Sequence, residues 1–290
     1  MTVGELVERL SGWIERLMPA EERRDRLVVE VRERFGGSRD AVTAGVCREI
    51  ERVAWEHSRH LLLVFEADGT EPADEESKGW PPDDPDEVRK RAAGVSEVRR
   101  LDGGACLIRV YGLDAAGPAR PFLEAAFTLA GGAERILLDL RGNGGGDPAT
   151  VALIAGRLLG DEAEQLSEVV YRDRRRQWWT PDLAPGTALT QPVAVLVGEG
   201  TFSSGEALAY HLQVRGRVTV VGERTPGAAD HVTPIRLGPS VLGLLPEAYV
   251  VDSRTGTNWE GRGVVPDVSC PAGEAVAAAL RLQLRRRPAG

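Results

Sequence analysis

Four short apolar runs, separated by helical patterns, most strongly constrain how this chain can fold. The runs are CLIRVYGL (106–113), RILLDL (135–140), VAVLVGEG (193–200) and RVTVVG (217–222). Each is bounded by turn residues, which is typical of a strand. Asp147 and Pro148 predict the start of a helix that ends near Gly160, because Asp is a good N-cap and Pro suits the first helical position. A second helix is predicted from near Ser203 to about Val214. This alternation favours an α/β domain with helices packed on a sheet.

The segments outside this pattern predict further elements. Apolar residues at steps of three and four over 3–17 and 27–35 indicate helices, and Ser38 can cap a third helix that carries apolar residues from 42 to 53. The run 61–65 predicts a strand, and GEAVAAALRLQLRRR predicts a terminal helix with arginines favourably placed at its end. We therefore divide the chain into four parts. These are a helical bundle (1–60), a strand with an acidic linker (61–94), an α/β core (95–272) and a C-terminal helix and tail (273–290).

Composition excludes several classes of protein. The 44 acidic residues outnumber the 36 basic residues, which argues against a dedicated nucleic-acid binder. No stretch approaches the roughly 20 apolar residues that span a bilayer, and the N-terminus lacks the unbroken apolar core of a signal peptide. The three cysteines are scattered and odd in number, so we expect them to be reduced and the protein to be cytoplasmic. The four histidines have no metal-ligand spacing, so we predict neither a metal nor a cofactor.

The run RILLDLRGNGGGDP (135–148) places three successive glycines between a strand and a helix cap. Glycines there allow a ligand to approach the backbone closely, and free N–H groups beside a helix N-terminus can hold an anion or a developing oxyanion. Phosphate binding is a rival interpretation, although the sequence lacks the Lys-Ser/Thr of a P-loop and the spacing of a dinucleotide fingerprint. The third interpretation is a glycine-rich loop without any ligand.

The run VAVLVGEGTFSSGEALAYHLQ (193–213) places two serines at the start of a helix. Such a serine can simply cap the helix. It can also be a nucleophile that is presented at a strand-to-helix turn, where the helix N-terminus favours its alkoxide.

Together these runs resemble a known family. DLRGNGGG, then TFSSGEALAY, VVGERTPGAADH and TGTNWEGRGVVPDV, in this order, are similar to the tail-specific (C-terminal processing) serine protease superfamily. The likeness covers about residues 95–270. It is greatest to the bacterial branch that resembles interphotoreceptor retinoid-binding protein, which also has a helical N-terminal region and no PDZ insert. The resemblance implies a crotonase/ClpP-like core of repeated ββα units with an N-terminal helical bundle.

The resemblance also implies site residues. The family's nucleophile falls on Ser203, with Ser204 as the adjacent alternative. The oxyanion hole would use backbone N–H groups around Gly144, Gly145 and Gly146, together with that of Ser204.

The general base is where the sequence departs from the family. The family's lysine position holds Ala228, and no lysine follows Lys90, so a Ser-Lys dyad in the core is excluded. The related tricorn-type proteases use a histidine on the strand before DLRGNGGG, where this chain has Arg109. Their glutamate is matched by Glu260.

His231 is the remaining candidate for the base. It matches the histidine of the branch's GGAHP segment if the loop is aligned with a shift of one residue. Without that shift, Asp230 aligns with this histidine. An imidazole can take the Ser203 proton, and Glu260 could orient the imidazole or shape the pocket. The alternative interpretation of His231 is a solvent-exposed loop residue.

Two functions follow from these patterns. The first is a serine hydrolase, a peptidase that uses Ser203, His231 and Glu260. The alternative is a non-proteolytic member that binds an apolar small molecule or performs enolate-type chemistry, such as cyclisation or elimination. We expect a peptide or small-molecule substrate and neither a nucleic-acid nor a membrane partner; a homo-oligomer is left open.

Overall fold

The computed structural model describes residues 1–67, 80 and 82–283 and shows a mixed α/β protein. Most of the predicted acidic linker (68–79 and 81) and the end of the tail (284–290) lie outside the described residues. The chain divides into two compact units. The first unit is Met1–Pro82, Val169–Arg176 and Ala228–Val250, and the second is Asp83–Glu168, Gln177–Gly227 and Val251–Gly290. The structure thus groups 169–176 and 228–250 with the N-terminal residues, whereas the sequence-based division placed them in the core.

Helices and strands share one hydrophobic core in the first unit. The helices are α1 (Val3–Leu17), α2 (Glu22–Phe35) and α3 (Ala44–Ala54), and the strands are β1 (Leu62–Phe65), β9 (His231–Gly238) and β10 (Val241–Asp252). The apolar stripes of the helices pack together with Leu61, Leu63, Ile235, Leu237 and Leu245. The helical N-terminal segment therefore buries its apolar faces partly against strands.

The predicted cap of the third helix is wrong. The helix begins after Thr43, whose side-chain oxygen accepts a hydrogen bond from the Val46 N–H at 3.2 Å. Ser38 instead exchanges hydrogen bonds with Asp40. Ser38 and Thr43 are both residue types that cap helices well, so residue type alone does not distinguish them.

Strands of the first unit belong to a five-stranded sheet. Its order is β1-β10-β5-β6, with β9 paired to β10. Strands β5 (Gln165–Tyr171), β6 (Arg175–Trp179) and β10 contribute residues to both units. β10 is antiparallel to both β1 and β9, and its register with β9 shifts between Pro246 and Ala248.

The second unit is built on a six-stranded sheet with the order β11-β8-β7-β4-β3-β2. The strands are β2 (Val95–Arg100), β3 (Ala105–Val110), β4 (Arg135–Asp139), β7 (Val193–Val197), β8 (Thr219–Gly222) and β11 (Val268–Ser269). All neighbours are parallel except β2, which is antiparallel to β3. The four predicted apolar runs are thus confirmed as β3, β4, β7 and β8.

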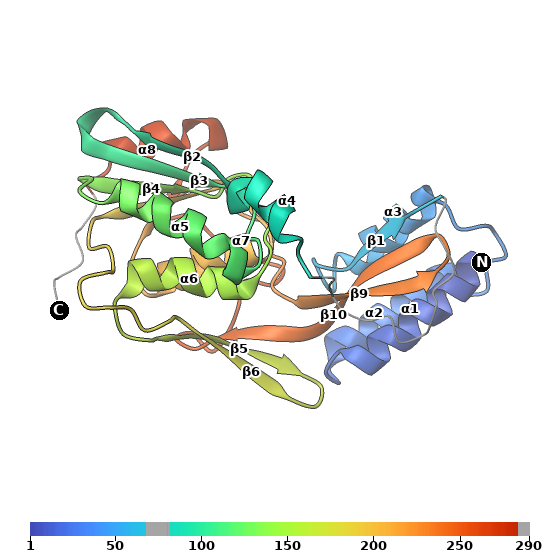
Figure 1. Ribbon diagram of the computed structural model, residues 1–290. Coiled ribbons are helices and arrows are strands. Elements are labelled where there is room, and N and C mark those ends of the chain that lie inside the picture. The colour runs from blue at the N-terminus through green and yellow to red at the C-terminus, as the bar shows by residue number, and fades with distance from the viewer. Residues whose placement is uncertain (68–79, 81, 284–290) are drawn as a thin grey trace. The chain divides into compact units, whose positions relative to one another are not determined.

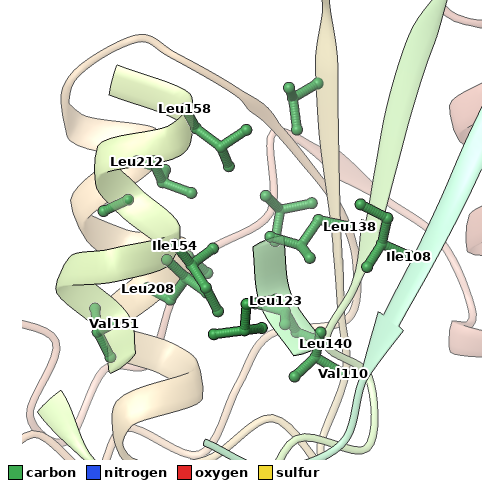
Figure 2. Packing of buried hydrophobic residues seen from close by; sticks show 14 of the residues in the cluster. Ile108, Val110, Leu123, Leu138, Leu140, Val151, Ile154, Leu158, Leu208 and Leu212 are labelled. Atoms are coloured by element: carbon green, nitrogen blue, oxygen red, sulfur yellow. The ribbon is translucent and has the colours of Figure 1, made fainter. Parts of the chain in front are cut away.

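Helices cover both faces of this sheet (Figure 1). Helices α5 (Ala116–Ala130), α6 (Pro148–Leu159) and α7 (Ser204–Val214) pack on one face, where their aliphatic side chains meet those of β3 and β4 (Figure 2). Helix α8 (Ala275–Arg281) packs on the other face. The second unit also contains α4 (Pro85–Lys90) and the short 3₁₀ turns Ala92–Gly94, Asp102–Gly104 and Ala272–Glu274. Within the described part of the chain, no helix is both long and apolar enough to cross a membrane.

This architecture positions the two candidate motifs. Strands β4 and β7 are parallel neighbours, and each is followed by a loop and a helix. Asp147 caps α6 as predicted, because its side chain accepts the Ala149 N–H at 2.9 Å. The carboxyl ends of parallel neighbours meet at one edge of the sheet, so the glycine loop (140–147) and the serine turn (198–203) lie side by side.

Candidate active site

Ser203 has a backbone conformation that L-residues rarely adopt. It is the N-cap residue of α7, with φ 54° and ψ −123°. An ordinary N-cap residue has extended dihedral angles. A non-glycine residue held at positive φ costs about 1–3 kcal/mol and is concentrated at functional sites. The geometry is therefore that of a serine at a strained strand-to-helix turn, rather than that of a simple cap.

The glycine loop lies directly against this turn. A Cβ atom built on Gly145 would be 2.7 Å from Ser203 Cβ and 3.0 Å from the Phe202 carbonyl oxygen, and the φ of Gly145 is +97°. At Gly146, where φ is +136°, a Cβ would be 2.0 Å from the Leu113 carbonyl oxygen. A side chain at Gly145 would collide with Ser203, and one at Gly146 would collide with the backbone of Leu113, so both sites require glycine.

The N–H groups of this loop differ in their hydrogen bonding. Gly144 donates to the Tyr111 carbonyl at 3.2 Å, and Gly145 donates to Asn143 Oδ1 at 2.9 Å. Within the described residues, the N–H groups of Gly146 and Ser204 have no hydrogen-bond acceptor. These two groups are therefore the ones left to bind an anion.

The hydroxyl of Ser204 is committed to the scaffold. Ser204 Oγ donates to the Gly146 carbonyl at 2.7 Å, so it holds the glycine loop against the first turn of α7. This bond favours Ser203 over Ser204 as the nucleophile.

Glu206 is a residue of the site that the sequence interpretation missed. Its side chain is fully buried and accepts hydrogen bonds from the Ser203 N–H at 3.0 Å, from Thr225 Oγ1 at 2.5 Å and from the Gly227 N–H at 2.7 Å. The signal was available, since Ser203-Ser204-Gly205-Glu206 fits the S-x-x-E pattern of a capping box.

Glu260 lies in a loop of the second unit that packs on the segment around Gly227. The Gly261 N–H donates to the Gly227 carbonyl at 2.9 Å, and the Glu260 N–H donates to Asn258 Oδ1 at 2.9 Å. The neighbouring Trp259 is buried. This loop is thus joined to the same part of the fold as Glu206.

His231 belongs to the first unit, where it begins β9. Its Nδ1 atom lies 3.2 Å from Glu247 Oε1, and its ring centroid is 5.8 Å from that of Tyr171. The side chain is 23% exposed, while that of Glu247 is only 9% exposed. The carboxylate found beside this imidazole is therefore that of Glu247 in β10.

Asp230 matches the family's histidine position when the loop is aligned without a gap. Its side chain, however, forms hydrogen bonds with N-terminal residues. Its carboxylate accepts two hydrogen bonds of 2.9 Å from Arg23 and one of 2.7 Å from Ser58 Oγ. Its carbonyl lies 2.6 Å from His60 Nδ1. Asp230 thus ties the start of β9 to the N-terminal residues within the first unit.

Arg109, at the position where the tricorn-type proteases have a histidine, forms ion pairs with two acidic side chains. Its Nε donates to Asp139 Oδ2 at 2.9 Å, and its Nη1 lies 2.8 Å from Glu97 Oε2. Burial by itself would raise the pKa of the Asp139 carboxyl, but hydrogen bonds from Arg141 and Arg109 outweigh it and hold that pKa below its usual value. A guanidinium cannot accept a proton, so this position supplies no base.

His211 forms a buried pair within the second unit. Its Nδ1 lies 2.7 Å from Asp252 Oδ2, and its ring meets Trp259 edge-on at 5.8 Å. Burial lowers the pKa of His211 despite the carboxylate beside it. Arg215 also donates to Asp252 at 2.9 Å, so the three side chains form a network at the base of the loop that carries Glu260.

The described residues contain no group of three or more His, Cys, Asp or Glu side chains that could hold a metal ion.

Comparison with curated proteins shows similarity to carboxyl-terminal-processing proteases. The chain is 33% identical over 139 residues to a carboxyl-terminal-processing protease of Picosynechococcus sp., covering 41% of this chain and 32% of that protein. A protease of the same name from Synechocystis sp. is 40% identical over 97 residues, covering 33% of this chain and 22% of the relative. The chain thus spans about a third or less of the length of these curated relatives.

Solved structures resemble the chain over almost its whole length. A lipoprotein from Streptococcus agalactiae superposes with a TM-score of 0.60 at 14% identity, covering 97% of this chain and 96% of that one. At this identity the likeness concerns the fold alone. The family model for Peptidase family S41, which includes the tail-specific proteases, matches residues 106–270, more than half of the chain. The chain therefore belongs to peptidase family S41.

Proposed function

We propose that the chain is a serine peptidase in which Ser203 is the nucleophile. The observation that carries this proposal is the strained backbone of Ser203, held against Gly145 at the N-terminus of α7. Strain of this kind persists only where the surrounding structure over-determines it. A serine that merely capped α7 would not need it.

In the proposed reaction, Ser203 Oγ attacks the carbonyl carbon of a peptide bond. The tetrahedral oxyanion is stabilised by the N–H groups of Gly146 and Ser204, the two that have no acceptor among the described residues. The sequence-based oxyanion hole also included Gly144 and Gly145, but their N–H groups are engaged with Tyr111 and Asn143. Collapse of the intermediate expels the amine and leaves an acyl-enzyme, which water then hydrolyses.

His231 remains the proposed base, and a Ser-Lys dyad remains excluded by the sequence. The imidazole would take the proton of Ser203 and return it to the leaving amine. Because Glu247 is the carboxylate beside His231 Nδ1, we assign the orienting role to Glu247 and keep for Glu260 the role of shaping the pocket.

Several finer expectations remain proposals. These are the crotonase/ClpP-like arrangement of repeated ββα units, the N-terminal helical bundle, a cytoplasmic location and a peptide or small-molecule substrate; a homo-oligomer is left open. The curated relatives are carboxyl-terminal-processing proteases, which supports a substrate that is a peptide or the end of an unfolded chain.

Fluorophosphonate labelling tests the proposal directly, because the probe reacts only with an activated serine. We expect the wild-type protein to be labelled, Ser203→Ala to be unlabelled and Ser204→Ala to be labelled more slowly. Mass spectrometry of a proteolytic digest would place the adduct on Ser203. A folded wild-type protein that resists labelling from pH 6 to 9 would overturn the proposal and favour the non-proteolytic alternative.

A further inference from the structure

We infer that Glu206 is a positioning residue that holds Ser203 in its reactive conformation and joins it to two loops of the second unit. This inference rests on the proposed function, because it concerns the nucleophile assigned there. Glu206 is completely buried, and its carboxylate receives one hydrogen bond from each of three different points of the chain.

The first contact is with the strained residue itself. The Ser203 N–H donates to Glu206 Oε2 at 3.0 Å. Hydrogen bonds to an ionised acceptor are roughly twice as strong as neutral ones. This bond fixes the peptide plane that precedes Ser203, which helps to keep φ at 54°. Without it, the turn could relax towards the extended dihedral angles of an ordinary N-cap, and Ser203 Oγ would move.

The other oxygen of Glu206 holds the segment after β8. Oε1 accepts from Thr225 Oγ1 at 2.5 Å and from the Gly227 N–H at 2.7 Å. These residues belong to the VVGERTPG segment, where the family's lysine would follow. The carboxylate therefore fixes the distance between the nucleophile turn and this segment.

Thr225 extends the same network to a third loop. Its hydroxyl oxygen accepts the Val264 N–H at 2.7 Å while its proton goes to Glu206. The Gly263 backbone packs so closely that an added Cβ would be 1.9 Å from the Thr225 carbonyl oxygen. The runs SSGE, GERTPG and EGRGVV, which are far apart in the sequence, thus meet around one buried carboxylate.

The donor and acceptor inventory explains why the residue must be an acid. The three groups described above all donate to the Glu206 side chain, and a carboxylate is a side chain that only accepts. In Glu206→Gln, one oxygen is replaced by an NH₂ group, which would face either the Ser203 N–H or the Gly227 N–H. One buried donor then loses its acceptor, and the turn or the segment must shift.

The inference is tested by the kinetics of fluorophosphonate labelling, with the rate constant of the chemical step separated from the affinity of the reversible complex. We expect Glu206→Gln and Thr225→Val to lower the rate constant by about 10- to 100-fold, as a displacement approaching 1 Å can. The affinity should change less than about threefold, because neither side chain reaches the probe. Thr225→Ser keeps the hydroxyl and should restore a rate near that of the wild type. Glu162→Gln, which changes an exposed carboxylate outside the loops of the site, is the matched control and should leave the rate unchanged.

Two results would overturn the inference: an unchanged rate constant in Glu206→Gln, or equal loss in Thr225→Ser and Thr225→Val. If Glu206→Gln fails to fold, the two threonine variants decide alone. If the wild type is never labelled, the proposed function fails. The role of Glu206 can then still be tested by the NMR chemical shift of the Ser203 amide proton. A marked upfield move of that resonance in folded Thr225→Val, but not in Thr225→Ser, supports positioning, while an unmoved resonance in both contradicts it.

Discussion

Gly145 and Ser203 are in such close contact that a single methyl group does not fit between them. A Cβ on Gly145 would lie 2.7 Å from Ser203 Cβ and 3.0 Å from the Ser204 nitrogen. The residues are far apart in the sequence, and the parallel pairing of β4 with β7 brings their loops together. Substitutions at the glycine should therefore act on the serine.

We expect Gly145→Ala to abolish fluorophosphonate labelling, or to slow it by at least about 100-fold. The new methyl group would displace the Ser203 turn, and alanine is also strained at a φ of +97°. Gly142→Ala is the control, because a Cβ there meets no atom within 4 Å. Labelling of Gly145→Ala at the wild-type rate would mean that the nucleophile lies elsewhere.

Replacing Ser203 by glycine should stabilise the protein relative to Ser203→Ala while removing activity in both. Glycine adopts positive φ freely, whereas alanine keeps the strain of φ 54°. The difference should be about 1 kcal/mol in the free energy of unfolding, measured by urea titration. At Ser204, the first residue of α7, the order should be the reverse. Ser204→Ala should be more stable than Ser204→Gly, because alanine is the better helix former. The same order at both positions would contradict strain at Ser203.

The sheet of the second unit was predictable because its central strands are buried. Strands β3, β4 and β7 lie between neighbours and carry helices on both faces, so almost every side chain is apolar and the runs stand out. Helix α5 gives no such signal. It contains Gly117, Pro118 and Pro121, residues that normally mark turns, and tertiary packing decides its conformation.

The candidate site was predictable only in part. Motif order placed Ser203 beside the glycine loop, but no pattern indicates a strained φ. The pairing of His231 with Glu247 spans 16 residues and depends on the register of β9 and β10, which contains a bulge next to Glu247. A bulge changes which side chains face each other, so the sequence offered no means of finding this partner.

His231 and its two candidate acids can be compared by substitution. If His231 is the base, His231→Ala should lower turnover by about 10²–10⁴-fold. Glu247→Gln should lower turnover by a smaller factor and should have little further effect in the His231→Ala background, because the two act as a unit. Glu260→Gln should raise KM more than it lowers kcat. If Glu260→Gln were inactive while Glu247→Gln kept full activity, the orienting role would belong to Glu260.

Stability should fall as the pH drops from about 6.5 towards 5, because two histidines are buried. Burial lowers the pKa of both His60 and His211 below the value of about 6.5 expected in an unfolded chain. Below pH 6.5 the unfolded state therefore binds protons that the folded state does not, and the free energy of unfolding decreases. The pKa values of Glu5, Glu30, Asp139 and Asp252 are also lowered, but these acids act only below about pH 4.5, so this window belongs to the histidines.

His211→Asn isolates one of the two contributions. The asparagine keeps an N–H donor for Asp252 but cannot titrate. The variant should be less stable than the wild type at pH 7.5, because it loses the edge-on contact with Trp259. Its loss of unfolding free energy between pH 7.5 and 5.5 should be smaller than that of the wild type by about 1 kcal/mol, measured by urea titration at both pH values. Equal losses in the two proteins would contradict this, because they would mean that the pKa of His211 is the same in the folded and unfolded states. A smaller loss in the wild type than in the variant would mean that His211 is protonated in the folded state and forms an ion pair with Asp252.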